Sequence, residues 1–271
     1  MRLSLIAAAC LAATPTLAQE RVVVAGSALA EIVAALGASD RLVGRDTTVS
    51  YPEALTALPD VGYMRALSAE GLLSLGPDLI LADVDAGPQA TLDLVAATDV
   101  PVVRVTGGYT AQGVIDRIEA VAQALSLDPA PLVGQVQSAF ATLAEARVDA
   151  APVSAIFVLS AAGGRILASG QGTAAEGILE LAGAQNAITG FDGYRQMTDE
   201  AIIAAAPQAI VMMDRSGDHA LSDADILAHP ALGLTPAAEA GRIIRLDGAF
   251  LLGFGPRTPE AAQALMDALE G

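Results

Sequence analysis

Residues 62–81 read GYMRALSAEGLLSLGPDLIL, and residues 193–212, GYRQMTDEAIIAAAPQAIVM, repeat their pattern. When Glu70 is aligned with Glu200, both segments give Glu, one residue, two aliphatic residues, three residues, Pro, two residues and an apolar run. Both begin with Gly-Tyr, followed closely by an Arg. A repeat of this length predicts two structural units of similar build. Each unit is expected to place a Tyr/Arg loop before a helix that carries a Glu, and two such lobes would enclose a cleft.

Short apolar segments alternate with helical segments along the chain. We expect strands at residues 21–25, 41–44, 79–82, 102–105, 154–159, 209–213 and 242–246. Strands that alternate with helices are typical of an α/β fold with parallel sheets. The segment 129–149 carries Leu132, Val136 and Phe140 at helical spacing and lies between the two copies of the repeat. We interpret it as a helix that links two lobes; the alternative is an ordinary surface helix of a single domain.

The chain is therefore expected to have four parts. Residues 1–18 are typical of a signal peptide, because a charged start is followed by an apolar run too short to span a bilayer and by small residues up to Ala18. A lipoprotein signal at Cys10 is the less favoured alternative. With cleavage after Ala18, the remaining parts are an N-terminal α/β lobe over 19–128, the linking helix over 129–149 and a C-terminal α/β lobe over 150–271.

Composition excludes several classes of protein. The only cysteine, Cys10, is lost with the signal, so no disulfide, thiol nucleophile or cysteine metal site is expected. All 14 basic residues are Arg, which excludes a P-loop lysine and a lysine Schiff base, and no serine stands in a G-x-S-x-G context. A net charge of −17 disfavours binding to nucleic acid or anionic lipid. No apolar run after the signal is long enough for direct membrane insertion. We therefore expect a binding protein and no enzyme; an exported hydrolase is the disfavoured rival.

Three motifs resemble those of the substrate-binding proteins of haemin-uptake ABC transporters. They are the segments 61–71, VGYMRALSAEG; 170–175, GQGTAA; and 246–258, LDGAFLLGFGPRT. The resemblance implies a class III fold, with two Rossmann-like lobes of parallel sheets joined by one long helical spine. It also implies a periplasmic protein that captures haem in the cleft between its lobes and delivers it to an ABC permease dimer, downstream of an outer-membrane haem receptor system.

Other functions remain open within this fold. The Glu-helix, Pro and strand pattern is shared with cobalamin and ferric-siderophore binders, so such a ligand is the alternative. A haem sensor or storage protein is a further one that the sequence does not separate from a transporter component. Only two histidines are present, His219 and His229, which is too few for the zinc or manganese binders of the same fold.

Tyr63 is the expected ligand of the haem iron. A Tyr phenolate is a known axial ligand, but a free phenol titrates near ~10, so ligation at neutral pH requires a stabilised anion. If residues 63–65 are extended, the side chains of Tyr63 and Arg65 point the same way. Arg65 would then donate a hydrogen bond to the phenolate oxygen.

Further site residues are expected in the second lobe. Tyr194 and Arg195 stand where Tyr63 and its Arg stand in the first copy, and Arg195 would meet a haem propionate bidentately. Arg257, in the C-terminal motif, is a candidate of the same kind. The loop 161–164 contains no histidine, which disfavours a second axial ligand from that lobe. We expect Tyr51, Tyr109 and His229 to be structural.

Glu70 and Glu200 occupy matching positions, one per lobe. The resemblance implies that both engage arginines on the two halves of the permease dimer. The alternative is that each carboxylate only stabilises the N-terminus of its helix.

Overall fold

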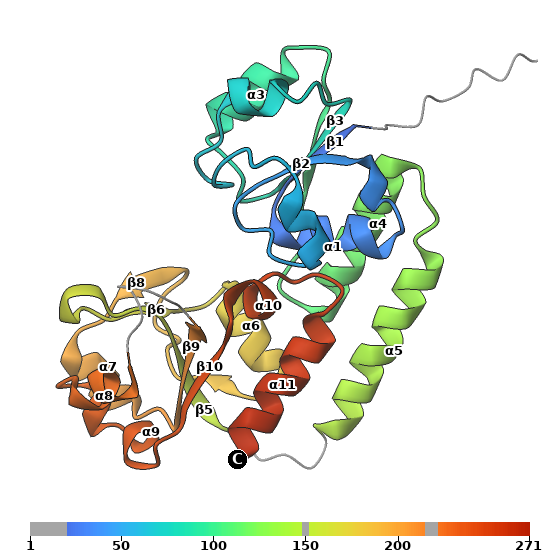
Figure 1. Cartoon of the computed structure of the whole chain (residues 1–271). Helices are drawn as coiled ribbons and strands as arrows, with labels where there is room; N and C mark the ends of the chain where they lie inside the picture. The colour runs from blue at the N-terminus through green and yellow to red at the C-terminus, as the bar shows by residue number, and fades with distance from the viewer. Residues whose placement is uncertain (1–20, 148–151, 215–221) are drawn as a thin grey trace, which may run out of the picture.

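The computed structural model describes residues 21–147, 152–214 and 222–271, which form two α/β lobes one above the other (Figure 1). The N-terminal lobe is built around a four-stranded sheet in the order β2-β1-β3-β4, with every pair parallel. Its elements are β1 (Val22–Ala25), α1 (Ser27–Ala35), β2 (Leu42–Arg45), α2 (Ala69–Leu73), β3 (Leu79–Asp83), α3 (Gln89–Ala96), β4 (Val102–Val105) and α4 (Ala111–Leu125). The parallel α/β prediction is confirmed for this lobe.

The C-terminal lobe has a mixed sheet, which corrects the prediction of a parallel one. The order is β10-β9-β5-β6-β8; β10, β9 and β5 run parallel, whereas β6 and β8 are antiparallel to their neighbours. Its elements are β5 (Ser154–Ser160), β6 (Leu167–Ser169), α6 (Ala174–Leu181), β7 (Gln185–Asn186), β8 (Tyr194–Gln196), α7 (Asp199–Ala205), β9 (Ala209–Asp214), α8 (Asp223–Ala228), α9 (Pro236–Glu239), β10 (Ile243–Asp247), α10 (Gly248–Leu252) and α11 (Thr258–Glu270).

The antiparallel pairing of β5 with β6 follows from a short connection. Residues 161–166 separate the two strands, and Gly163 and Gly164 adopt φ angles of 63° and 72° there. A short turn can join antiparallel strands, while parallel strands need a crossover of a dozen or more residues. The pair β6 and β8 thus extends the parallel core at one edge.

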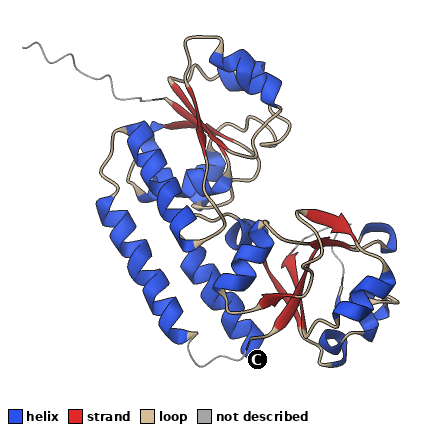
Figure 2. Ribbon diagram, turned by 180° about the vertical axis from the view of Figure 1, so that it is seen from behind, coloured by secondary structure: helices blue, strands red, loops and turns tan. Residues whose placement is uncertain are grey.

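The helix α5 (Ala130–Ala146) runs along the side of the molecule between the lobes (Figures 1 and 2). It buries Leu132, Val136, Phe140 and Leu143, the periodic apolar face expected from the sequence, and packs on α4 and α11. The predicted linking helix continued to residue 149, and its last two residues lie outside the described part of the chain, as does the expected signal peptide.

One hydrophobic core joins the two lobes. It contains α1 and α4 residues such as Leu29 and Ile118 together with C-terminal residues such as Phe157, Phe254 and Leu265. Each lobe also has a smaller core on the other face of its sheet. Because the lobes share packed side chains, their relative position is fixed by more than the linking helix. Within the described residues, no helix has both the length and the apolar character needed to cross a membrane.

A candidate ligand pocket between the lobes

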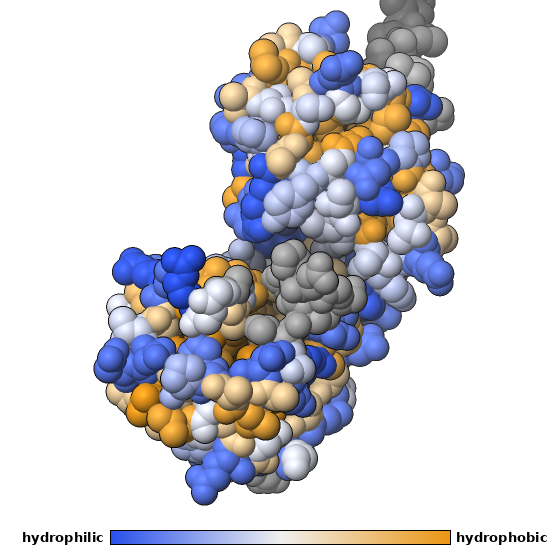
Figure 3. Space-filling model, turned by 60° about the vertical axis from the view of Figure 1, so that its left-hand side comes forward, coloured by the Kyte–Doolittle hydropathy of each residue, from blue (hydrophilic) through white to orange (hydrophobic). Residues whose placement is uncertain are grey.

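A pocket of about 580 Å³ lies between the two lobes. The N-terminal lobe lines it with Gly26–Ala28 at the start of α1, with Tyr63–Arg65, and with Asp83 and Asp85 at and just after the end of β3. The C-terminal lobe contributes residues 172–174, Tyr194 and Gly253. Its volume lies within the range of about 300–1,000 Å³ found for small-molecule sites. Figure 3 shows the two lobes meeting at a waist.

Tyr63 stands at this pocket, 45% exposed, with its phenol oxygen accepting a hydrogen bond of 3.0 Å from the guanidinium of Arg65. The expected contact is therefore present, but the expected conformation is not. Residues 63–66 form a turn, closed by the N–H of Ala66 donating to the carbonyl of Tyr63 at 2.7 Å. Met64, at the centre of the turn, is buried in the smaller core of the lobe and anchors it.

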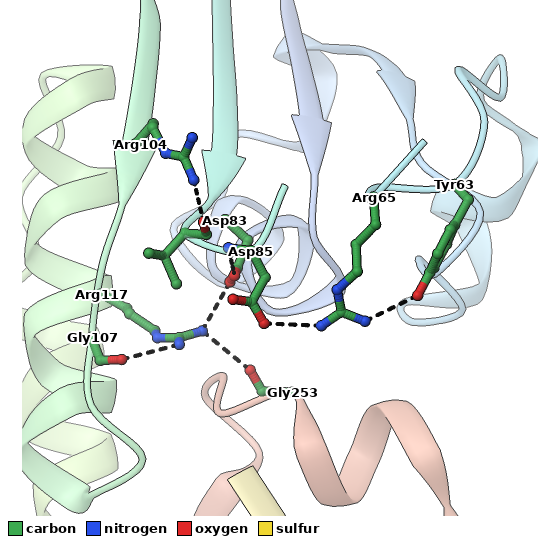
Figure 4. A network of polar contacts seen from close by, with 9 residues as sticks. Tyr63, Arg65, Asp83, Asp85, Arg104, Gly107, Arg117 and Gly253 are labelled. Atoms are coloured by element: carbon green, nitrogen blue, oxygen red, sulfur yellow. Dashed lines mark hydrogen bonds and ion pairs between the residues drawn. The ribbon is translucent and has the colours of Figure 1, made fainter. Parts of the chain in front are cut away.

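A chain of polar contacts continues from Arg65 to the floor of the pocket (Figure 4). Arg65 also donates to Asp85 at 2.9 Å, and the backbone N–H of Asp85 donates to Asp83 at 3.0 Å. Asp83 pairs with Arg117 of α4 at 3.1 Å, and Arg117 in turn reaches the carbonyl of Gly107. A longer contact of 3.5 Å joins Arg117 to the carbonyl of Gly253 in the other lobe. The sequence reasoning missed Asp83, Asp85 and Arg117.

The hydrogen bonds of Arg65 stabilise the charged form of its guanidinium. Partial burial disfavours the guanidinium cation, but its hydrogen bonds to Asp85 and Tyr63 outweigh this cost and raise the pKa of Arg65. Arg117 is almost fully buried, and its Nε makes no hydrogen bond. Among the described residues that line the pocket, the arginines are Arg65 and Arg117, and each is paired with one carboxylate.

Tyr194 lines the pocket from the opposite lobe, on the edge strand β8. Burial raises the pKa of its phenol, against the opposing effect of hydrogen bonds from the Ala175 backbone and Thr173. Arg195 follows directly on the strand and therefore points to the other face. It stacks over Phe191 at 5.2 Å and is not among the residues that line the pocket, where we had expected it.

Arg257 also lies elsewhere than expected. Its guanidinium binds Glu31 of α1 through two hydrogen bonds of 2.9 and 2.6 Å and stacks on Tyr51, 3.6 Å from the ring centre. It lines a second pocket of about 490 Å³ between α1, α5 and α11. Arg257 thus does not line the inter-lobe pocket and forms an ion pair between the lobes. Tyr51, expected to be structural, supplies the ring on which Arg257 stacks and lines the same second pocket.

Tyr109 was expected to be structural and has a double role. Its ring packs edge-to-face on Phe254 at 5.2 Å, which is the expected packing function. It also lines the pocket, and burial raises the pKa of its phenol. No motif in the sequence distinguishes it, because its place depends on segments far apart in the chain.

Two helix N-termini, one from each lobe, border the pocket. Gly26, Ser27 and Ala28 begin α1, which has no side-chain cap, and Gly172, Thr173 and Ala174 begin α6. The N–H groups and dipole at a helix N-terminus favour anions. The start of α1 thus offers uncapped backbone N–H groups to the pocket. At the start of α6, Thr173 caps the helix and the N–H of Gly172 already donates to the Glu176 carboxylate at 2.6 Å.

The remaining predicted residues lie outside the pocket. Glu70 and Glu200 are both exposed in the first turns of α2 and α7, whose N-caps are Ser68 and Thr198. His229 follows α8, and its Nδ1 accepts from two backbone N–H groups of the next turn. His219 lies outside the described residues, among which no cluster of His, Cys, Asp and Glu forms a metal site.

The family model described as "Periplasmic binding protein" matches residues 22–249. The structure of the periplasmic heme-binding protein BhuT in complex with two hemes is 42% identical, with a TM-score of 0.88, and the match covers 92% of this chain and 97% of that one. The apo form of the heme-binding protein RhuT from Roseiflexus sp. RS-1 is 34% identical, with a TM-score of 0.88 and coverages of 93% and 98%.

Two curated relatives widen the comparison. An uncharacterized ABC transporter substrate-binding lipoprotein, YvrC of Bacillus subtilis, is 26% identical over 88% of this chain and 76% of its own length. A vitamin B12-binding protein of Yersinia pestis is 36% identical, but only over 32% of this chain and 31% of its own length. The chain therefore belongs to the periplasmic binding protein family, whose two-lobed α/β architecture it has.

Proposed function

We propose that this protein binds haemin in the periplasm, holds it between its lobes with Tyr63 on the iron, and delivers it to an ABC importer. The observation that carries the proposal is Tyr63 at the inter-lobe pocket, with Arg65 donating to its oxygen at 3.0 Å. A guanidinium stays charged and favours the anionic form of an oxygen to which it donates. A phenolate so held is a suitable ligand for haem iron.

The rest of the pocket supports a flat, anionic ligand. Apolar side chains such as Met213 and Leu252 share the lining with the polar groups. The uncapped start of α1 offers backbone N–H groups to a carboxylate of haemin. We propose this helix end, rather than Arg195 or Arg257, as a contact of a propionate.

The relatives support the same ligand. BhuT and RhuT bind heme and match this chain over almost its whole length, whereas the vitamin B12-binding relative matches about a third. A cobalamin arrives with its metal already chelated and needs no phenolate from the protein. Cobalamin remains the second candidate on the strength of that partial match.

The partner and the location follow from the family. We propose a permease dimer as the acceptor of haem, with Glu70 and Glu200 as its contacts, and a purely non-catalytic role. The relative YvrC is described as an ABC transporter substrate-binding lipoprotein, which supports this partner. Export by residues 1–18 and cleavage after Ala18 are part of the same proposal.

A titration with two probes tests the ligand. The purified chain is titrated with haemin and, separately, with cyanocobalamin, while the absorption spectrum is recorded. We expect a saturable Soret band with haemin and no spectral change or heat of binding with cobalamin. Saturable binding of cobalamin without haemin binding would replace the proposed function by the second candidate.

A further inference from the structure

The side chain of Arg65 needs a partner that fixes its conformation. Its side chain is long and 56% exposed, and it starts from a turn at the surface of the pocket. Such a side chain loses considerable rotamer freedom when it is fixed. Among the described residues, its guanidinium donates hydrogen bonds to Tyr63 and to Asp85, at 3.0 and 2.9 Å.

The guanidinium of Arg65 bridges these two partners with different nitrogens. Nη1 donates to Tyr63 and Nη2 donates to Asp85. Because the guanidinium is a rigid planar fork, fixing Nη2 also fixes the direction of Nη1. Asp85 thus determines where the charge of Arg65 stands relative to the phenol oxygen.

Asp85 is itself fixed to the same loop. It follows β3, and its backbone N–H donates to Asp83, which the buried Arg117 holds. Two backbone hydrogen bonds join the next residues to the Tyr63 loop: Gly87 donates to Met64 at 2.8 Å, and Leu67 donates to Gly87 at 2.9 Å. The carboxylate and the phenol therefore belong to one hydrogen-bonded unit (Figure 4).

The charge of Asp85 is otherwise unfavourable in this pocket. A carboxylate that lines a site for a ligand with two carboxylates repels it, so its presence calls for a compensating role. We propose that Asp85 is a positioning residue, which holds Arg65 on the oxygen of Tyr63 and reserves Arg65 for the iron end of the ligand. This inference rests on the proposed function.

The variants Asp85→Ala, Asp85→Asn and Asp85→Glu test it, each also in the Arg65→Ala background. Asp99→Asn, which removes an exposed carboxylate from the same lobe, is the matched control for charge. The measurements are the phenolate-to-iron charge-transfer band of the haemin complex and the rate of haem transfer to apomyoglobin. Circular dichroism verifies the fold of each variant.

A phenolate that loses its donor is richer in electrons, so its charge-transfer band moves to longer wavelength. We expect this shift in Asp85→Ala, with haem loss roughly tenfold faster, since the charged hydrogen bond is weakened. Asp85→Glu should restore much of the wild-type band, and Asp85→Asn should lie between. In the Arg65→Ala background Asp85→Ala and Asp85→Asn should neither shift the band nor speed haem loss, because those effects act through Arg65. Removal of the repelling carboxylate should there slow haem loss, if it has any effect.

Equal effects of Asp85→Ala with and without Arg65 would overturn the proposal, and so would an unshifted band. Loss of haem binding in Asp85→Ala while Arg65→Ala still binds would overturn it as well. Failure of the proposed function would give a different result. In that case the wild-type protein mixed with haemin would show no charge-transfer band that Tyr63→Phe removes.

Discussion

At the scale of single residues, the pocket places two tyrosines from opposite lobes in unequal surroundings. Tyr63 is bound by a guanidinium, whereas Tyr194 receives its hydrogen bonds from Thr173 and the Ala175 backbone, both neutral. Burial raises the pKa of Tyr194, so its phenol keeps its proton through neutral and mildly alkaline pH. Tyr194 is thus suited to donate or accept hydrogen bonds and unsuited to bind iron as an anion.

The variant Tyr194→Phe should therefore keep the phenolate-to-iron band. It loses one neutral hydrogen-bonding group, so we expect haemin affinity to fall roughly fivefold, as for a hydrogen bond of about 1 kcal/mol. Absorption titration measures both quantities. Disappearance of the band in this variant would instead make Tyr194 the iron ligand.

At the scale of elements, α2 and α7 are the two copies of the sequence repeat. Each begins after a side-chain N-cap, Ser68 or Thr198, and each carries an exposed glutamate in its first turn. Hydrogen bonds to its own backbone and to Thr198 lower the pKa of Glu200, so this carboxylate is charged at neutral pH. The repeat thus presents one exposed glutamate at the start of a helix on each lobe, as the proposed docking requires.

The double variant Glu70→Gln with Glu200→Gln tests this docking. Both side chains lie outside the pocket, so haemin titration should be almost unchanged, while stimulation of the transporter's ATPase in reconstituted vesicles should be lost. Salt should weaken wild-type docking, because exposed charges are screened. Full stimulation by the double variant would reduce both glutamates to residues that stabilise helix N-termini.

The sequence predicted the elements that have strong local signals. The buried strands β1, β3, β5 and β9 are apolar runs, and α5 carries apolar residues at helical spacing. The strands β6 and β8 have three residues each, too few for a period to be recognised. Because β8 was not foreseen, the side chain of Arg195 was placed in the cleft rather than on the opposite face of a strand.

The candidate site was predictable only where its residues lie close together in the sequence. Tyr63 and Arg65 are two residues apart, so their contact could be inferred locally. Asp85 and Arg117 reach the pocket from other segments, and Arg257 pairs with Glu31 across 226 residues. Such contacts depend on how the lobes pack, which no single segment specifies.

At the scale of the whole molecule, the pair of Arg257 and Glu31 joins the lobes. Glu31 on α1 is 6% exposed, and Arg257 at the start of α11 covers it while stacking on Tyr51 and Phe250. Burial raises the pKa of Glu31, although Arg257 opposes this shift. A raised pKa means that the folded state binds the proton more tightly than the unfolded state, so this group favours folding at low pH and less so as pH rises.

Removal of Arg257 should therefore cost more at neutral than at acidic pH. In Arg257→Met the charged Glu31 has no partner, and we expect a loss of about 3 kcal/mol in the free energy of unfolding at pH 7. At pH 4 Glu31 takes up a proton and the loss should be smaller. Denaturant unfolding at both values measures it.

The double variant Glu31→Gln with Arg257→Met is the control. It leaves no unpaired carboxylate, so it should recover most of the stability at pH 7 and lose the pH dependence. An equal loss in Arg257→Met at both pH values would show that packing, rather than charge, is what Arg257 contributes.

The spectrum of haemin bound to Tyr63→Phe tests the central claim most directly. The substitution keeps the ring and removes the oxygen to which Arg65 donates. Tyr51→Phe, at the second pocket, is the matched control. We predict a high-spin ferric spectrum with a phenolate charge-transfer band in wild type and Tyr51→Phe, and loss of that band with weaker binding in Tyr63→Phe. An unchanged band and affinity in Tyr63→Phe would contradict the account.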